Sequence, residues 1–154
     1  PELCEALDRY ARARLTAADF VQTLAIDAEL GLEQITPQFH AMIEQLRPFG
    51  MGNPEPVFAA RGVRLGLPPK VLKEKHLRLR VVKETPGNNG RAQFHAFDAM
   101  GWRMVERTEK EPLVAGDVLD IAFTVEKNSN PEFAGLRLSL RDYAMAEKTA
   151  VHSA

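Results

Sequence analysis

The sequence has a single cysteine, Cys4, so it cannot form an internal disulfide. Disulfide frameworks are typical of small secreted domains, and the absence of one favours a reducing compartment such as the cytoplasm. The sequence also lacks an apolar run of the roughly 18 residues that a membrane-spanning helix needs, and its first residues do not resemble a signal peptide. Together these absences predict a cytoplasmic protein with no membrane association.

An excess of basic residues is also missing. The chain has 20 Lys and Arg residues against 21 Asp and Glu residues, a formal net charge of -1. Nucleic-acid-binding domains usually show a basic excess, so the total charge argues against that class of partner. Apolar residues make up 45% of the chain, a fraction too high for a disordered protein. Its 154 residues suffice for one domain, or for a small domain with an appendage.

Motifs for catalysis and metal binding do not occur either. The histidines have no partner at metal-ligand spacing, and the sequence contains no phosphate-binding loop and no nucleophile motif. The histidines in question are His40, His76, His95 and His152. We therefore expect no catalytic residue, no metal ligand and no cofactor in this chain.

The first third of the sequence predicts a helix, a strand and a second helix. Apolar residues recur at intervals of three and four over residues 3–15, as on one face of an amphipathic helix. Alternation over residues 23–30 indicates a half-buried strand. Thr36 followed by Pro37 is typical of a helix start, and Pro48 ends that helix.

Residues 48–56 read Pro-Phe-Gly-Met-Gly-Asn-Pro-Glu-Pro, with three prolines and two glycines. No regular helix or strand tolerates that density, so this segment is a connector. Its composition leaves two interpretations open. It is either a linker between two packed units or a fixed loop held against both of them.

After this connector the sequence changes to short segments with the alternation of half-buried strands. Strands are predicted over residues 57–65, 76–83, 93–98, 118–126 and 136–140, and a helix over residues 102–110. A Gly-Asn-Asn-Gly turn at residues 87–90 joins the second and third strands as a hairpin. Five strands with a helix between the third and fourth is the element order of an OB-fold, and a small SH3-like barrel is the main competitor.

The predicted fold class is therefore mainly β with some α. A five-stranded OB-fold barrel occupies residues 57–143 and follows the connector. Residues 1–47 form a helix–strand–helix linker segment, and residues 144–154 form a loose tail without periodicity.

Basic residues are concentrated in one part of the sequence. Residues 1–58 contain 4 basic and 9 acidic residues, residues 59–95 contain 9 and 2, and residues 96–154 contain 7 and 10. The net charges of these segments are -5, +7 and -3. The positive segment covers the first three predicted strands, and an OB-fold binds its ligand on strands two and three. Such a face neutralises phosphates with Lys and Arg and stacks bases on aromatic rings.

Arg78 and Arg80 lie two residues apart in one predicted strand, so their side chains point the same way. The candidate nucleic-acid-binding residues are Arg61, Lys70, Lys75, His76, Arg78, Arg80, Phe97 and Phe133. The same pattern permits a plainer interpretation. A stripe of arginines also occurs on the solvated face of many antiparallel sheets, and Phe97 belongs to the core if its side of the strand faces inward.

Residues 46–58, which include the connector, closely resemble the segment that leads into the OB domain of the bacterial RecJ single-stranded-DNA exonucleases. The resemblance continues on both sides, at residues 10–15 and 26–30 and at residues 75–79 and 135–142. It therefore covers nearly all of the chain, and the Pro-Phe-Gly-x-Gly-Asn-Pro-Glu-Pro run is its most specific part.

The resemblance implies a two-metal nuclease, using Mn or Mg, that degrades single-stranded DNA from the 5′ end in recombination and repair. Its metal ligands lie in DHH motifs, and a Gly-Gly-His motif lies in its DHHA1 domain. Neither motif occurs in this chain, which starts at Pro1 with a helical pattern already running. We expect a piece of a longer polypeptide that follows the DHHA1 domain, and no catalytic residue is carried over.

Three functions remain open at this point. The resemblance implies an OB module that holds single-stranded DNA for the rest of the parent nuclease. Alternatively, the basic patch receives the acidic tail of a single-strand-binding protein. In the third hypothesis the domain is structural and closes a ring around the nuclease core.

Overall fold

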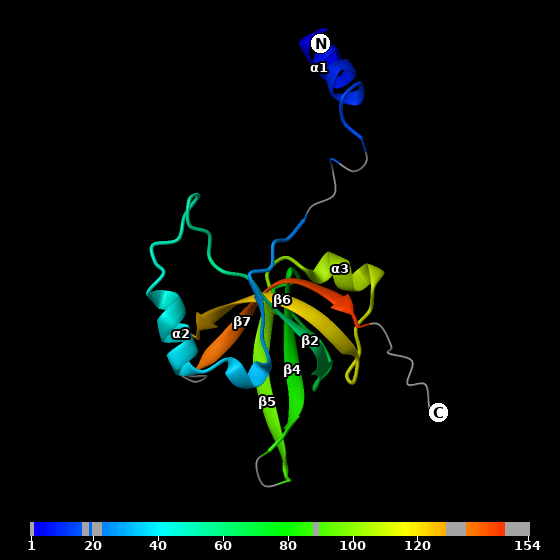
Figure 1. The fold of residues 1–154 in the computed structure, drawn as a ribbon. Helices are drawn as coiled ribbons and strands as arrows, with labels where there is room; N and C mark the ends of the chain where they lie inside the picture. Colours follow the sequence, from blue (N-terminus) through cyan, green and yellow to red (C-terminus); the bar gives the residue numbers. More distant parts are fainter. Residues whose placement is uncertain (1, 17–18, 20–22, 88–89, 129–134, 147–154) are drawn as a thin grey trace, which may run out of the picture.

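A computed structural model describes residues 2–16, 19, 23–87, 90–128 and 135–146. The elements in chain order are α1 (Glu2–Arg12), β1 (Ala28–Glu29), the 3-10 helix η2 (Leu32–Gln34), α2 (Pro37–Glu44), β2 (Phe58–Leu65), β3 (Lys70–Leu72), β4 (His76–Pro86), β5 (Ala92–Gly101), α3 (Val105–Lys110), β6 (Val118–Lys127) and β7 (Leu136–Met145). Figure 1 shows them on the ribbon.

Five of these strands close into a barrel. Antiparallel pairs join β2 to β4, β4 to β5, β7 to β6 and β6 to β2, and a parallel pair joins β5 to β7. The helix α3 lies between the third and fourth barrel strands. This closed ring is the OB-fold, so the five predicted strands and the predicted fold class are confirmed.

The barrel interior is filled by the alternate apolar residues of its strands. Leu77, Leu79 and Val81 of β4 are fully buried, as is Phe123 of β6. Burying each such side chain contributes about 1.5–3 kcal/mol relative to leaving it exposed. The polar residues between them in β4 point outward, because successive side chains of a strand face opposite sides.

The segment before the connector packs on the same core. Leu32 of η2 and Ile43 of α2 are buried with the barrel residues. The ring of Phe39 meets that of Phe58 edge to face, with 5.3 Å between centroids. Thr36 caps α2 by accepting a hydrogen bond from the backbone N–H of Phe39, as the Thr-Pro start predicted.

The predicted strand over residues 23–30 is mostly wrong. Only Ala28 and Glu29 form a strand, β1, which pairs in parallel with β2, and both residues are exposed. Leu24 and Ile26 are exposed as well. Their alternation therefore does not correspond to a buried face.

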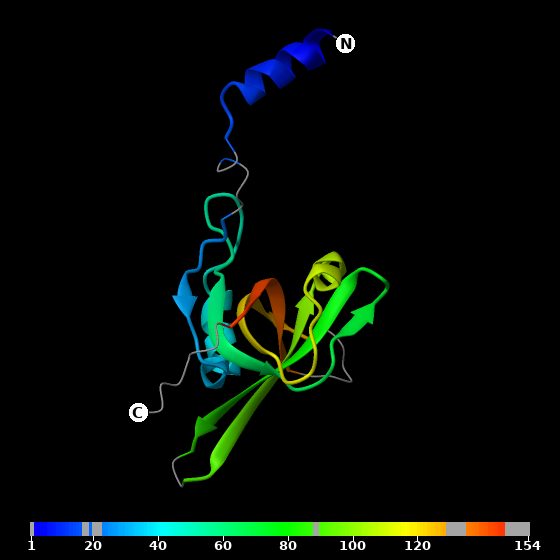
Figure 2. The same cartoon turned by 90° about the vertical axis from the view of Figure 1, so that its right-hand side faces the viewer.

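The amphipathic helix over residues 3–15 is confirmed as α1, which ends at Arg12, but none of its residues is buried. Figures 1 and 2 show α1 standing away from the barrel. None of the described helices combines the length and apolar character needed to span a membrane. At the other end, β7 runs to Met145, so the predicted loose tail begins at least two residues too early, and residues 147–154 lie outside the described part of the chain.

The connector is a shaped loop. The side-chain amide of Asn53 donates to the carbonyl oxygens of Leu46 and Pro48, at 2.7 and 3.0 Å. Glu55 pairs with Arg141 of β7 at 2.9 Å, which ties the loop to the barrel. These contacts favour a fixed loop over a free linker.

Candidate nucleic-acid interface

The outward side chains of β4 form a basic surface. His76, Arg78 and Arg80 alternate with the buried residues of that strand, and Lys70 of β3 lies directly opposite Arg78 in the register. Lys75 precedes β4 in the turn from β3. We call the outward surface of β3, β4 and β5 the outer face. It brings together four of the eight predicted residues, namely Lys70, His76, Arg78 and Arg80. The fifth, Lys75, lies in the adjoining turn and lines a hollow with Glu74, Glu106 and Glu109.

The two arginines share one carboxylate. Asp98 of β5 lies directly opposite Arg80 in the register. Its Oδ2 accepts from Nη2 of Arg78 at 2.7 Å, and its Oδ1 accepts from Nη1 of Arg80 at 3.1 Å. The Asp98 side chain is 20% exposed and the two arginine side chains are 34% and 41% exposed. The ion pairs are therefore partly shielded from water and still reachable from it.

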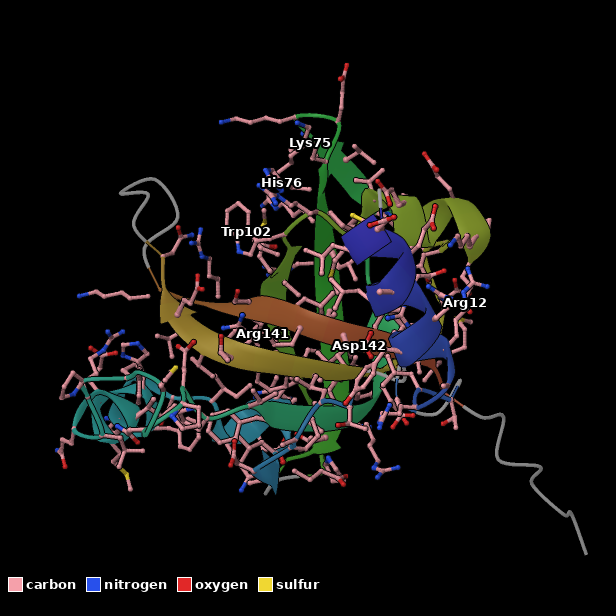
Figure 3. All side chains as sticks on the ribbon, turned by 90° about the horizontal axis from the view of Figure 1, so that it is seen from above. Arg12, Lys75, His76, Trp102, Arg141 and Asp142 are labelled. Carbon is pink, nitrogen blue, oxygen red and sulfur yellow. The ribbon has the colours of Figure 1, made fainter. Side chains whose placement is uncertain are left out.

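An aromatic pair marks one end of the outer face. The rings of His76 and Trp102 meet edge to face, with 4.9 Å between centroids, and Trp102 is 47% exposed. The backbone N–H of Arg103 donates to Nδ1 of His76 at 3.2 Å. The guanidinium of Arg137 lies 5.9 Å from the centre of the Trp102 ring. Figure 3 shows Lys75, His76 and Trp102 gathered at this end. We call His76 and Trp102 the aromatic end.

Trp102 was not among the predicted site residues. The sequence prediction placed it at the start of a helix over residues 102–110, but α3 begins only at Val105. Trp102 instead lies in the turn that follows β5. The available signal was that the only tryptophan of the chain lies four residues after the end of the predicted strand over residues 93–98, on the ligand-binding face.

Unusual backbone conformations border the aromatic end. Within the described residues, three non-glycine residues have positive φ: Lys73 at 49°, Glu74 at 58° and Arg103 at 58°. Lys73 and Glu74 form the turn between β3 and β4, and Arg103 follows Trp102. Such conformations cost free energy and tend to cluster at binding sites.

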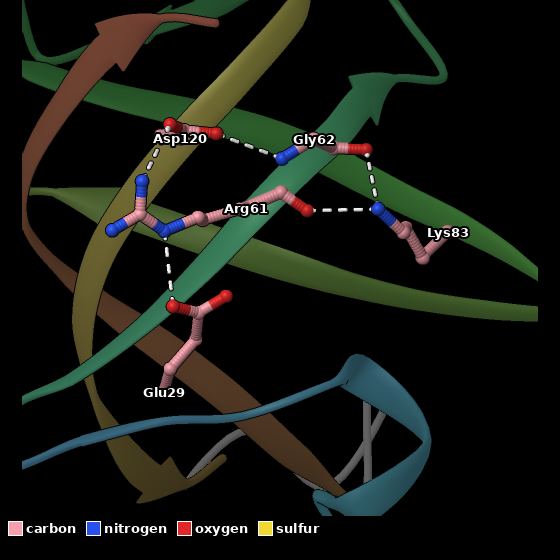
Figure 4. A network of polar contacts seen from close by, with 5 residues as sticks. All are labelled: Glu29, Arg61, Gly62, Lys83 and Asp120. Atoms are coloured by element: carbon pink, nitrogen blue, oxygen red, sulfur yellow. Dashed lines mark hydrogen bonds and ion pairs between the residues drawn. The ribbon is translucent and has the colours of Figure 1, made fainter.

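Arg61 lies in a different cluster, shown in Figure 4. Its guanidinium contacts Glu29 of β1 at 2.9 Å and Asp120 of β6 at 4.0 Å. Asp120 also accepts from the backbone N–H of Gly62, and the Lys83 amine donates to the carbonyl oxygens of Arg61 and Gly62. We call these residues the Arg61 cluster. It supports a bulge in β2, and its partners come from β1 and β6 as well as β4.

Comparison with known proteins adds to this geometry. The RecJ OB domain family matches residues 26–142 of the chain. This chain belongs to that family. The resemblance predicted from the sequence is thereby confirmed.

The RecJ OB domain described here is also similar to one curated relative. It is 26% identical over 148 residues to the single-stranded-DNA-specific exonuclease RecJ of Bacillus subtilis. The match covers 96% of this chain and 17% of that relative, so the chain spans about a sixth of the relative's length.

Solved structures with a similar fold include three single-stranded-DNA-binding proteins. The small protein of Streptomyces coelicolor has a TM-score of 0.44 at 12% identity, and the match covers 59% of this chain and 92% of that one. Mitochondrial Rim1 of S. cerevisiae has a TM-score of 0.44 at 11% identity, and the match covers 64% of this chain and 96% of that one. The Plasmodium falciparum protein in complex with single-stranded DNA has a TM-score of 0.41 at 10% identity, and the match covers 58% of this chain and 91% of that one.

Of the two predicted stacking residues, Phe97 lies away from the outer face and Phe133 lies outside the described residues. Phe97 lies opposite the buried Val81 in the register and packs against the core. It therefore does not share a face with the arginines, contrary to its proposed stacking role. The exposed phenylalanine of β5 is Phe94, which is 66% exposed. Phe133 lies outside the described residues.

One titratable group of the barrel has a shifted pKa. Burial raises the pKa of Tyr143 of β7, whose ring lies 4.3 Å from the Arg107 guanidinium. Arg107 of α3 also contacts Asp142 and the backbone carbonyl of Tyr143. These contacts attach α3 to the barrel, so this shift reflects packing.

Proposed function

We propose that this RecJ OB domain binds single-stranded DNA along its outer face. The observation that carries the proposal is the row formed by Lys70, Arg78 and Arg80, which leads to the aromatic end. Cations on such a row neutralise phosphates and release counterions, while an exposed ring offers a base a surface to stack on. The curated relative's description as a single-stranded-DNA-specific exonuclease supports the same partner.

The charge of the outer face also supports a polyanionic partner. Within the described residues, neither Lys70 nor Lys75 has a carboxylate at ion-pair distance, and Asp98 is the acid that pairs with Arg78 and Arg80. Lys70, Arg78 and Arg80 thus share this surface with the paired acid Asp98, and Glu84 lies further along the same side of β4. Phosphate contacts and base stacking do not depend on base identity, so binding is tolerant of sequence.

In the longer protein, the domain would hold the DNA strand on its way to a separate active site. The parent would be a cytoplasmic RecJ-like hydrolase, a 5′–3′ exonuclease of single-stranded DNA acting in repair and recombination. Its Mn or Mg ions would belong to other domains. The described residues of this chain hold no group of three His, Cys, Asp or Glu side chains that could ligate such an ion, so the proposal uses no metal here.

Salt titration of the purified chain with a labelled oligonucleotide tests the proposal. If about four cations contact phosphates, log K against log[salt] falls with a slope of about -3. We expect the Arg78→Ala/Arg80→Ala variant to bind at least about 10-fold more weakly and its slope to flatten by about 1.4, because two contacts are lost. The matched control is Arg61→Ala, which removes an arginine of the Arg61 cluster and should leave both quantities unchanged.

Other outcomes would point to other functions. Binding that ignores salt, or that weakens equally in Arg61→Ala, would contradict the assignment of the outer face. An acidic peptide with an apolar C-terminal residue can be added as a competitor. If it displaced the labelled oligonucleotide more effectively than unlabelled oligonucleotide does, the tail of a single-strand-binding protein would be favoured as the partner. No binding of either ligand would favour the structural role. Thermal unfolding of each variant checks that the fold is retained.

A further inference from the structure

Asp98 occupies the place on the outer face where a phosphate would be expected. It is the acid that contacts Arg78 and Arg80, and it lies on β5 directly opposite Arg80. Carboxylate and phosphate oxygens are the two acceptors that guanidinium groups prefer, and both bind in the same geometry. A DNA phosphate approaching the arginine pair therefore meets an acceptor of its own kind already bound there.

The way in which Asp98 is shared keeps each ion pair replaceable. It gives one oxygen to each arginine, Oδ2 to Arg78 and Oδ1 to Arg80. Neither of these contacts is the two-pronged pairing of one guanidinium with both oxygens of a carboxylate, which is the stronger arrangement. All three side chains are also partly exposed, so solvent weakens the attraction further.

We infer that Asp98 acts as an internal competitor for DNA phosphates and thereby sets the affinity and selectivity of the outer face. This inference rests on the proposed function. A single anion that displaces Asp98 exchanges one acceptor for another and gains little. A phosphate chain gains more, because it also reaches Lys70, directly opposite Arg78, and Lys75 in the adjoining turn. Asp98 thus favours extended polyanions over short or singly charged ligands.

The variant Asp98→Asn tests this inference, because it keeps the size of the side chain and one oxygen acceptor but removes the negative charge. We expect the affinity for a long single-stranded oligonucleotide to rise about 3- to 10-fold at low salt, the effect of deleting one charge several ångströms from one or two phosphates in water. The affinity for a dinucleotide should rise by a larger factor, so the ratio of the affinity for the long ligand to that for the short one should fall; an equal rise would contradict the effect on selectivity.

A matched control separates this local effect from the change in total charge. Glu29→Gln also neutralises a carboxylate paired with an arginine, at 2.9 Å from Arg61, but in the Arg61 cluster. At about 0.15 M salt we expect its affinity for the same oligonucleotide to stay within about 2-fold of the wild type, because Glu29 pairs with Arg61 rather than with the arginines of the outer face and salt screens exposed charges at longer range. An equal gain in Glu29→Gln would overturn the inference.

The remaining outcomes separate the inference from the proposed function. Weaker binding by Asp98→Asn, with an unchanged thermal unfolding midpoint, would show that Asp98 orients the arginines, and the inference would be wrong while the outer face remained the binding site. If the wild type bound DNA tightly and both Asp98→Asn and Arg78→Ala/Arg80→Ala bound it with the same affinity, the DNA would lie elsewhere on the domain. The proposed function would then fail for the outer face, and the inference with it.

Discussion

The outer face and the Arg61 cluster both combine arginines with carboxylates, yet the two arrangements serve different ends. In the Arg61 cluster, one guanidinium has two acids beside it, and the nearby Lys83 amine is held by two backbone carbonyl groups. On the outer face, two guanidinium groups share the carboxylate of Asp98. The first arrangement sets two acids beside one guanidinium group, whereas the second sets one carboxylate between two guanidinium groups.

This difference explains why counting charges along the sequence identifies a basic segment without locating a binding surface. Residues 59–95 have a net charge of +7, and both Arg61 and Lys83 contribute to it. Arg61 pairs with the acids Glu29 and Asp120, which lie in other segments of the sequence. Only the register of the barrel strands shows which cations are already paired.

The largest effect on the outer face is expected from Trp102→Ala. Base stacking on an aromatic ring contributes about 1–3 kcal/mol per base, so the affinity for single-stranded DNA should fall roughly 5- to 150-fold. The slope of log K against log[salt] should not change, because no phosphate contact is lost. Oligonucleotide titration at several salt concentrations measures both quantities.

The variant Trp102→Phe is the control for this prediction. A phenyl ring retains a stacking surface and should recover part of the affinity. If Trp102→Ala bound DNA as tightly as the wild type, the aromatic end would be a packing contact between β4 and the turn after β5. The outer face would then act through its charges alone.

On the other side of the comparison, Gly62→Ala should destabilise the fold without affecting DNA binding. Gly62 has a φ of +60°, and an added Cβ would lie 3.0 Å from the Lys83 amine. The strained backbone and the displaced amine together should lower the free energy of unfolding by about 1–2 kcal/mol. Denaturant unfolding measures the change, and DNA affinity at a temperature where the variant is folded should equal that of the wild type.

The matched substitution Gly52→Ala separates this strain from a general effect of alanine. Gly52 lies in the connector, where an added Cβ has nothing within 4 Å. We expect its stability to stay within about 0.5 kcal/mol of the wild type. A loss of DNA affinity in folded Gly62→Ala would mean that the Arg61 cluster also contributes to the binding surface.

The sequence predicts the barrel well because alternation is a local property. The alternation of Leu77, Leu79 and Val81 with polar residues correctly places Arg78 and Arg80 on the outward side. Phe97 shows where this reasoning fails. Its segment has aromatic residues on both sides of the strand, so only the pairing with β4, which sets Phe97 opposite Val81, shows which side faces inward.

Contacts between distant residues account for the other differences. Asp98 contacts both Arg78 and Arg80 and so joins β5 to β4, in a register that no local pattern specifies. The meeting of His76 with Trp102 depends equally on where β4 begins and β5 ends. Conversely, residues 23–30 alternate in the sequence, but Leu24 and Ile26 do not pack on the core. Of these residues only Ala28 and Glu29 form a strand, which pairs with β2.

The smallest expected effect concerns the strained turn beside the aromatic end. Two consecutive residues with positive φ are what a type I′ hairpin turn requires, and this conformation favours Asn and Gly over the Lys73 and Glu74 present here. The variant Glu74→Gly should therefore raise the free energy of unfolding by about 0.5–1 kcal/mol. The same substitution in β4, Glu84→Gly, should lower it by about 0.5–1 kcal/mol, because that strand position has ordinary backbone geometry. If denaturant unfolding showed that the free energy of unfolding rises in Glu74→Gly and falls in Glu84→Gly, the turn would store strain. Retained DNA affinity in Glu74→Gly would show that the shape of the outer face does not depend on this strain. Equal signs would mean that the turn is unstrained, and the backbone of the outer face would then resemble that of the other strands.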